Sequence, residues 1–148
     1  MSLPAAFPIL FTRLFIEAVD GVKKELKKAV EGLIGKHKQA YAPGLLKEID
    51  EQCGAAIGAW ASRQPAAFLE GLMRWHEDLY HWGFTEDEKC LLNLDRKDDI
   101  MAVTAARGPA CIRARLQLLH HSLELLRRFV QPVLVLENVL TDIGGPIA

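Results

Sequence analysis

Apolar residues recur at steps of three and four along most of the chain, which is the spacing of one face of an α-helix. The first such stripe begins at Phe11 and ends near Leu33, ahead of the helix-breaking residues 41–44. Its members are Phe11, Phe15, Ala18, Val22, Leu26, Ala29 and Leu33. We therefore predict a first helix whose buried side is this stripe.

Prolines and glycines predict the next two helices. Pro43 suits the first turn of a second helix, and Pro65 is expected to end that helix and to open a third. Gly83 is the expected C-terminal stop of the third helix. The apolar seams of these two helices contain Leu46, Ile49, Cys53, Ile57, Trp60, Phe68, Leu72, Trp75, Leu79 and Trp82. We interpret the three tryptophans on these seams as core residues.

Further boundaries follow in the last third of the chain. Residues 85–88 have the pattern of a capping box, with Thr85 as the N-cap of a short helix that ends at the turn 93–95. Another short helix is expected over 97–107, and Gly108 with Pro109 should separate it from the longest clear helix. The seam of that helix contains Ile112, Leu116, Leu119, Leu123, Leu126 and Val130. Pro132 should break or kink it, which leaves a final apolar, turn-rich segment over 133–143.

The predicted fold class is all-α, with a single bundle of five to six helices. No segment alternates apolar and polar residues as a half-buried strand does, except weakly at 133–135. We expect the bundle to occupy residues 9–143, after an N-terminal extension of residues 1–8 and before a flexible tail of residues 144–148.

Composition agrees with a folded domain without a strongly charged partner. The 148 residues are 50% hydrophobic and carry a formal net charge of −1, which argues against disorder and gives no global basic field for nucleic acid. The lysine-rich stretch 23–38 is typical of a solvated helix face. The apolar runs are too short to cross a bilayer, and the first residues lack the basic region of a secretory signal. We therefore expect a cytoplasmic protein, in which Cys53, Cys90 and Cys111 are reduced thiols packed as small hydrophobes.

The search for chemistry predicts no catalytic residue, no metal site, no cofactor and no small-molecule substrate. Phosphate-binding glycine patterns are absent. His76 and His81 lie about 140° apart around a helix, so they do not converge on one ion. His121 shares a face with Gln117, Glu124 and Arg128, which has the polarity of a solvated side. Two alternatives stay open: a metal- or oxygen-binding bundle that uses His76, His81, His121 and Glu124, and a ligand-sensing bundle whose tryptophans line a pocket.

A second stripe on the third predicted helix points to a partner instead. This stripe lies beside the main seam and consists of Leu69, Met73, His76 and Tyr80. A helix that is apolar over so much of its surface is deeply buried or contacts another protein. The candidate interface is this stripe together with the polar side of the longest clear helix, namely Gln117, His121, Glu124 and Arg128.

Residues 68–79 are a Leu-rich run that contains the aromatic Trp75 and ends in an Asp-Leu pair, Asp78 and Leu79. With the segments that follow, up to residue 143, this run resembles the C-terminal domain of bacterial clamp-loader delta-prime subunits, and the resemblance covers residues 65–143. Asn93 and Asp95 stand where the family often has an Asn-x-Asp loop, and 134–140 resemble its closing Leu-x-Leu-Glu-Asn-Leu-Leu run. One departure is at 130–132, Val-Gln-Pro, where the family commonly has Asn-x-Asn before the last helix.

The resemblance implies a non-enzymatic collar domain, which packs beside matching domains of the other clamp-loader subunits, gamma/tau and delta. In that family the collar holds the ring together during DNA replication, within the DNA polymerase III holoenzyme, and contacts DNA only indirectly. The chain would then be a piece of a longer subunit, and residues 1–3 an artificial start. Because the gamma/tau subunits end in a similar helix, a gamma/tau collar domain is the nearest alternative.

Overall fold

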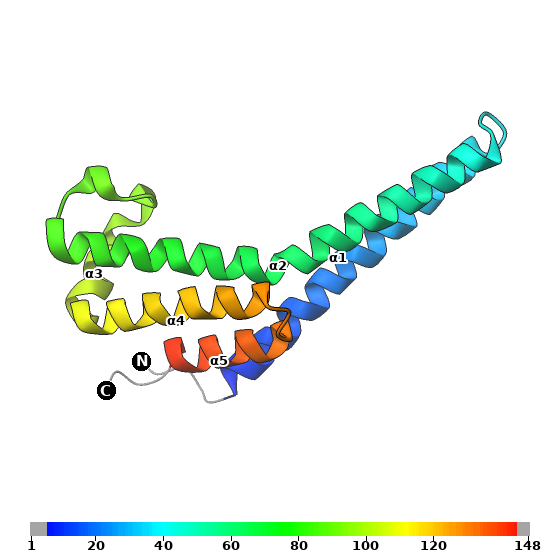
Figure 1. Cartoon of the computed structure of the whole chain (residues 1–148). Coiled ribbons are helices and arrows are strands. Elements are labelled where there is room, and N and C mark those ends of the chain that lie inside the picture. Colours follow the sequence, from blue (N-terminus) through cyan, green and yellow to red (C-terminus); the bar gives the residue numbers. More distant parts are fainter. Residues whose placement is uncertain (1–5, 145–148) are drawn as a thin grey trace. The chain divides into compact units, whose positions relative to one another are not determined.

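The computed structural model describes residues 6–144, and almost all of this part of the chain is helical (Figure 1). Within it there are five α-helices, two short 3₁₀ helices and no strand. The elements are α1 (Phe7–His37), α2 (Pro43–Thr85), η1 (Glu88–Cys90), η2 (Leu94–Arg96), α3 (Lys97–Arg107), α4 (Pro109–Arg127) and α5 (Pro132–Gly144). The predicted all-α class is confirmed. In the described part, every helix is too short or too polar to cross a membrane.

The chain divides into two compact units. The hairpin unit is Arg13–Gln64, and the bundle unit combines Met1–Thr12 with Pro65–Ala148. The sequence pattern treated residues 9–143 as one bundle, and it contains no signal for a division after Thr12. The second division, at Pro65, falls on a residue that the pattern did single out.

Pro65 lies inside α2, so the predicted boundary between a second and a third helix is wrong. A proline removes one backbone hydrogen bond from a helix interior and usually kinks or ends the helix. In the preceding turn, Ser62 Oγ donates to the Ala59 carbonyl at 2.9 Å and Gln64 Nε2 to the Trp60 carbonyl at 3.1 Å. Neither bond replaces the one that the Pro65 nitrogen cannot donate to the Ala61 carbonyl, and the helix continues without it.

The end of α2 also differs from the prediction. The helix passes Gly83 and ends at Thr85, and Glu86 follows with a left-handed φ of 49°. Thr85 is the last residue of α2 and not the N-cap of η1; its hydroxyl donates to the His81 carbonyl at 2.9 Å and accepts from the Asp87 N–H at 3.3 Å. The residue that caps η1 is Asp87, whose carboxylate accepts from the Lys89 N–H at 3.0 Å. The capping box was misplaced because a threonine can bond back to its own helix as readily as forward.

Gly83 has a packing role instead of a terminating one. A Cβ atom there would lie 3.2 Å from Cγ2 of Thr104 on α3. The Thr104 hydroxyl in turn donates to the Leu79 carbonyl at 3.3 Å. The absence of a side chain at Gly83 therefore lets α3 approach α2 closely.

The boundaries of α3 and the start of α4 match the prediction. Gly108 separates the two helices with φ 70° and ψ 156°, a conformation that only glycine adopts without strain. At the other end of α4, Phe129 N–H bonds to the Leu126 carbonyl and Val130 N–H to the Leu125 carbonyl, both at 3.1 Å. This pair of bonds is the Schellman motif, in which the left-handed residue is usually glycine. Here it is Phe129, with φ 62°.

The segment expected to be turn-rich after Pro132 is the helix α5, with Pro132 as its first residue. Its buried side consists of Val135, Leu136, Val139 and Leu140. Proline is tolerated at that first position, where no intrahelical N–H bond is needed. The weak strand-like alternation at 133–135 is part of the helical stripe.

The core of the bundle unit joins the helices α2, α3 and α4 with Leu91, the residue after η1. Its buried cluster is Leu79, Leu91, Ile100 and Ile112, and Trp75, Tyr80, Trp82 and Val103 pack against it. The expected core roles of Trp75 and Trp82 are therefore confirmed. Near the chain start, the Phe11 ring lies 5.4 Å from that of Phe68, which places the first turns of α1 against α2.

The hairpin unit is much more open. Only Leu46 and Ile57 are buried among its residues. The predicted stripe on α1 is not its buried side, because from Ala18 to Leu33 every member is exposed. The half-buried side of α1 here runs instead through Val19, Lys23, Val30 and Ile34. The cysteine prediction also needs correction, since Cys90 is exposed while Cys53 and Cys111 are half-buried.

Candidate partner interface

A buried carboxylate holds the loop after α2 in place. Asp78 is fully buried on α2. Its Oδ1 accepts from the Leu92 N–H at 2.8 Å, and its Oδ2 accepts from the Asn93 N–H at 2.8 Å and from Asn93 Nδ2 at 2.7 Å. A buried charge persists only when its hydrogen-bonding capacity is satisfied. The loop between η1 and η2 is thereby tied to the middle of the bundle unit.

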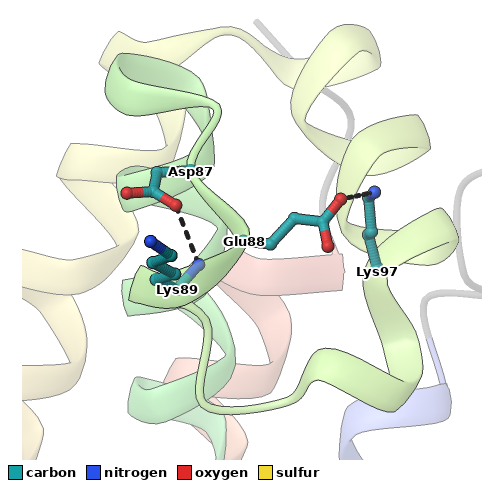
Figure 2. A network of polar contacts seen from close by, with 4 residues as sticks. All are labelled: Asp87, Glu88, Lys89 and Lys97. Atoms are coloured by element: carbon teal, nitrogen blue, oxygen red, sulfur yellow. Dashed lines mark hydrogen bonds and ion pairs between the residues drawn. The ribbon is translucent and has the colours of Figure 1, made fainter.

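The same loop is joined to α3 by a second set of polar contacts (Figure 2). The carboxylate of Glu88 on η1 is paired with the ammonium group of Lys97, the first residue of α3. The Lys97 Nζ atom also lies 5.7 Å from the ring centroid of Trp82, within the range of a cation–π contact. These contacts link η1 and the end of α2 to the first residue of α3.

His76 lies in the interior and not on the predicted surface. It is 3% exposed, and its Nδ1 donates to the Leu72 carbonyl at 2.8 Å. Burial lowers the pKa of His76 below its ordinary value, and the nearby Arg107 guanidinium acts in the same direction, while the bond to Leu72 opposes both. The imidazole is therefore kept neutral, as a structural hydrogen-bond donor.

A groove lies between α2 and α4 of the bundle unit. It has a volume of about 470 Å³. Its lining residues are Glu70, Met73, Arg74, His120, Leu123, Glu124 and Arg127. Two apolar residues lie among five polar or ionisable ones, the composition of an interface with a small apolar centre and a polar rim.

The charges of this groove have no partner within the described residues. Two acidic and two basic side chains, Glu70, Glu124, Arg74 and Arg127, line it. The ion pairs in residues 6–144 lie elsewhere, at Lys47–Glu51, Arg96–Asp99 and Glu88–Lys97. Charges of both signs that are left unpaired around a concave surface can select a partner by complementarity.

The structure separates the eight predicted interface residues into two groups. Leu69 is buried and so is His76, whereas Met73 and Tyr80 are half-buried beside them on α2. Gln117, His121 and Glu124 are exposed on α4, and Arg128, the residue directly after α4, is exposed as well. Of the eight, only Met73 and Glu124 line the groove.

Five groove residues were not among those predicted. Three of them, His120, Leu123 and Arg127, lie on the α4 side, and Glu70 and Arg74 lie on α2. Their spacing of three and four residues on each helix was visible in the sequence. What the sequence did not contain was the pairing of these two faces, because α2 and α4 are distant along the chain.

The histidines proposed for the metal-binding alternative do not form a cluster. In the span 6–144, no three His, Cys, Asp or Glu side chains lie where they could hold one ion. His76 is buried, while His81 and His121 are exposed.

Phe129 is the most exposed large apolar side chain among the described residues, at 96%. It stands at the turn between α4 and α5 in the left-handed conformation described above. Next to it, Val133 and Leu134 on the first turn of α5 are 37% and 58% exposed. Aromatic residues are enriched at the centres of protein interfaces, so this turn is a second candidate contact point.

Comparisons of the chain with family models, curated proteins and solved structures find no match.

Proposed function

We propose that this chain is an oligomerisation domain of a DNA polymerase III clamp-loader subunit of the delta-prime type. In this role it helps to hold the clamp-loader ring together during DNA replication and does no chemistry itself. Its partners are the gamma/tau and delta subunits, and it meets DNA only through the assembled ring.

The observation that carries the proposal is the bond between Asp78 and Asn93. These residues come from two separate segments of the family resemblance, the Leu-rich helix that ends in Asp-Leu and the Asn-x-Asp loop that follows it. Asn93 donates to the Asp78 carboxylate through both its main chain and its side chain. Two motif positions that are 15 residues apart are thus hydrogen-bonded to each other. A chance likeness between Leu-rich helices gives no reason for such a contact.

The order of elements gives further support. After α2, two short 3₁₀ helices lead to α3, and the long α4 precedes a closing helix that contains the run 134–140. This is the order expected from the resemblance. The groove between α2 and α4, with its unpaired charges, is a surface through which a neighbouring helical domain could be selected.

Reconstitution with the purified gamma/tau and delta subunits of the same organism tests the proposal. We expect the chain to elute with them in size-exclusion chromatography as one complex, and to bind no ATP. Independent elution at micromolar concentrations of every subunit would overturn the proposal.

A charge-reversal variant locates the contact. The double substitution Arg74→Glu with Arg127→Glu changes two groove residues and should weaken the complex by at least about tenfold, since opposed like charges cost several kcal/mol. The matched control is Lys89→Glu, an exposed position on η1, which should leave the affinity unchanged. Equal effects of both variants would place the contact outside the groove.

A further inference from the structure

The hairpin unit has a broad apolar face that nothing in the unit covers. On α1 the exposed large residues are Leu14 (65%), Val22 (47%), Leu26 (40%) and Leu33 (57%). On the turn and on the first part of α2 they are Tyr41 (53%), Leu45 (45%) and Ile49 (39%). Val22, Leu26 and Leu33, which are four and seven residues apart, make one continuous stripe, and Leu14, eight residues before Val22, lies about 80° to one side of it.

The stripes of the two helices lie on the same side of the hairpin. At 100° per residue, each stripe lies roughly a quarter turn away from the side that faces the other helix. Because α1 and α2 are antiparallel here (Figure 1), these two quarter turns lead to one common face. A cavity on that side, near the turn, is lined by residues of both helices, among them Leu33, Tyr41 and Ile49.

The opposite side of the hairpin is polar. A second cavity between the same two helices is lined by Lys27, Glu31 and Asp50, together with Val30, Gly54 and Ile57. The hairpin therefore has one apolar and one charged face. A charged face is well solvated in water, whereas the apolar face becomes more stable when another surface buries it.

The energetics of the hairpin require such a cover. Only Leu46 and Ile57 are buried within Arg13–Gln64, and helices obtain most of their stability from burying an apolar side. The six large apolar side chains on this face, Val22, Leu26, Leu33, Tyr41, Leu45 and Ile49, are each at least 39% exposed and amount to a patch of the order of several hundred Å². Patches of that size on soluble proteins mark interaction sites.

The two arms of the hairpin carry opposite charge. Residues 21–38 contain six lysines and two glutamates, a net charge of +4. Residues 43–60 contain one lysine against two glutamates and one aspartate, a net charge of −2. At the outer rim of the apolar face, Lys36 on α1 and Glu48 on α2 carry opposite charge, so a second copy of the same hairpin is complementary to the first when each α1 lies across the α2 of the other.

We propose that the apolar face of Arg13–Gln64 is a self-association surface, on which two copies of the chain form an antiparallel four-helix bundle. The contact is isologous, and its two-fold axis runs along the hairpin. This axis places α1 of one copy across α2 of the other, whereas an axis across the hairpin would place basic arm on basic arm. The four apolar stripes then form one core. This self-association goes beyond the proposed function and does not depend on it.

Sedimentation of the full chain over a concentration series tests the proposal. We expect a reversible monomer–dimer equilibrium. The triple variant Leu26→Gln, Leu33→Gln and Ile49→Gln should raise the dissociation constant by at least about a hundredfold. The matched control, Lys27→Gln, Glu31→Gln and Asp50→Asn, alters the opposite face and should still dimerise. A wild-type chain that stays monomeric at high micromolar concentration, or a triple variant that dimerises normally, would overturn the proposal.

Charge reversal tests the orientation independently of the apolar core. Lys36 borders the stripe of α1, and Glu48 borders that of α2, where it accepts a bond from Gln52 at 3.1 Å. Lys36→Glu should weaken the dimer about tenfold at low salt, and addition of Glu48→Lys should restore most of the loss. Absence of rescue would contradict the arm-across-arm arrangement, even if the triple variant had failed to fold.

Other covers of the apolar face give different results. If the face lies on a membrane, the chain stays monomeric and co-sediments with anionic vesicles. If another part of the chain covers it, the chain is monomeric at all concentrations and binds no vesicles. Either outcome overturns the proposal without touching the proposed function, because the clamp-loader assay uses the groove variants of the bundle unit.

Discussion

Asp78 and Asn93 are joined by two hydrogen bonds to one carboxylate oxygen, from the main-chain N–H at 2.8 Å and from the side-chain amide at 2.7 Å. The carboxylate is fully buried, and its other oxygen accepts from Leu92. The substitution Asp78→Ala leaves the N–H groups of Leu92 and Asn93 and the Asn93 side-chain amide without their acceptor. We expect a loss of about 3 kcal/mol in the free energy of unfolding, measured by urea titration.

Two comparison variants distinguish the effect of the Asp78 carboxylate from the effects of neighbouring side chains. Asn93→Ala removes only the side-chain bond and should cost about 1 kcal/mol. Asp95→Ala changes an exposed carboxylate of the same loop and should stay within about 0.5 kcal/mol of wild type. If Asp78→Ala were as mild as Asp95→Ala, the anchoring role of Asp78 would be refuted.

His76 makes stability depend on pH. Because burial lowers the pKa of His76 in the folded chain below 6.5, the unfolded chain takes up a proton first as the pH falls. The contribution of the neutral imidazole is thus fully present above pH 6.5 and decreases as the pH falls from 6.5 toward the lowered pKa. Urea titrations between pH 7.5 and pH 5 should show this decrease. In His76→Gln, which keeps a hydrogen-bond donor near Leu72, the loss of stability between pH 7.5 and pH 5 should be smaller. If this variant lost as much stability as the wild type, groups other than His76 would cause the pH dependence.

Phe129 should limit stability. A residue with a Cβ atom in the left-handed conformation costs roughly 1 kcal/mol, and the 96% exposed ring of Phe129 regains nothing by packing within the described chain. We expect Phe129→Gly to raise the free energy of unfolding by about 0.5–1 kcal/mol. Phe129→Ala, which keeps the Cβ atom, should give no such gain. A destabilised glycine variant would mean that the ring supports the fold.

Two glycines should respond to alanine in opposite directions. Gly108→Ala places a Cβ atom at φ 70° and ψ 156°, and should destabilise the chain by about 1–3 kcal/mol. Gly71 is an exposed position on α2 with no atom within 4 Å of an added Cβ. Gly71→Ala should therefore stabilise the chain by about 0.5–1 kcal/mol through helix propensity. Thermal unfolding followed by circular dichroism measures both changes. If both variants shifted the unfolding temperature in the same direction, the different conformational roles of Gly108 and Gly71 would be contradicted.

Local chemistry explains which helix boundaries could be predicted. Gly108 with Pro109 marked a boundary correctly, because both residues restrict the backbone whatever surrounds them. The predictions at Pro65 and Thr85 were wrong. The helix α2 continues through Pro65 although one backbone hydrogen bond is lost, and the Thr85 hydroxyl both donates back to His81 and accepts from the Asp87 N–H.

The candidate interface was only partly visible in the sequence. Periodicity found a second stripe on the helix of Leu69 and His76, but it does not distinguish a stripe that packs inside from one that meets a partner. Both residues turned out to be buried. The groove residues of α4 lie on a face that the pattern could describe only as polar.

The sequence by itself determined the helical class, the boundaries around α3, and the apolar and polar sides of each helix, because these depend on residues three or four apart. Tertiary structure decided the rest. It made Asp78 the anchor of the loop at Asn93, turned His76 inward, and opposed Glu70 and Arg74 to the residues of α4. It also left the α1 stripe from Ala18 to Leu33 exposed. The physical reason is that periodicity specifies which face of a helix is apolar, whereas only the packing of distant segments determines what covers that face.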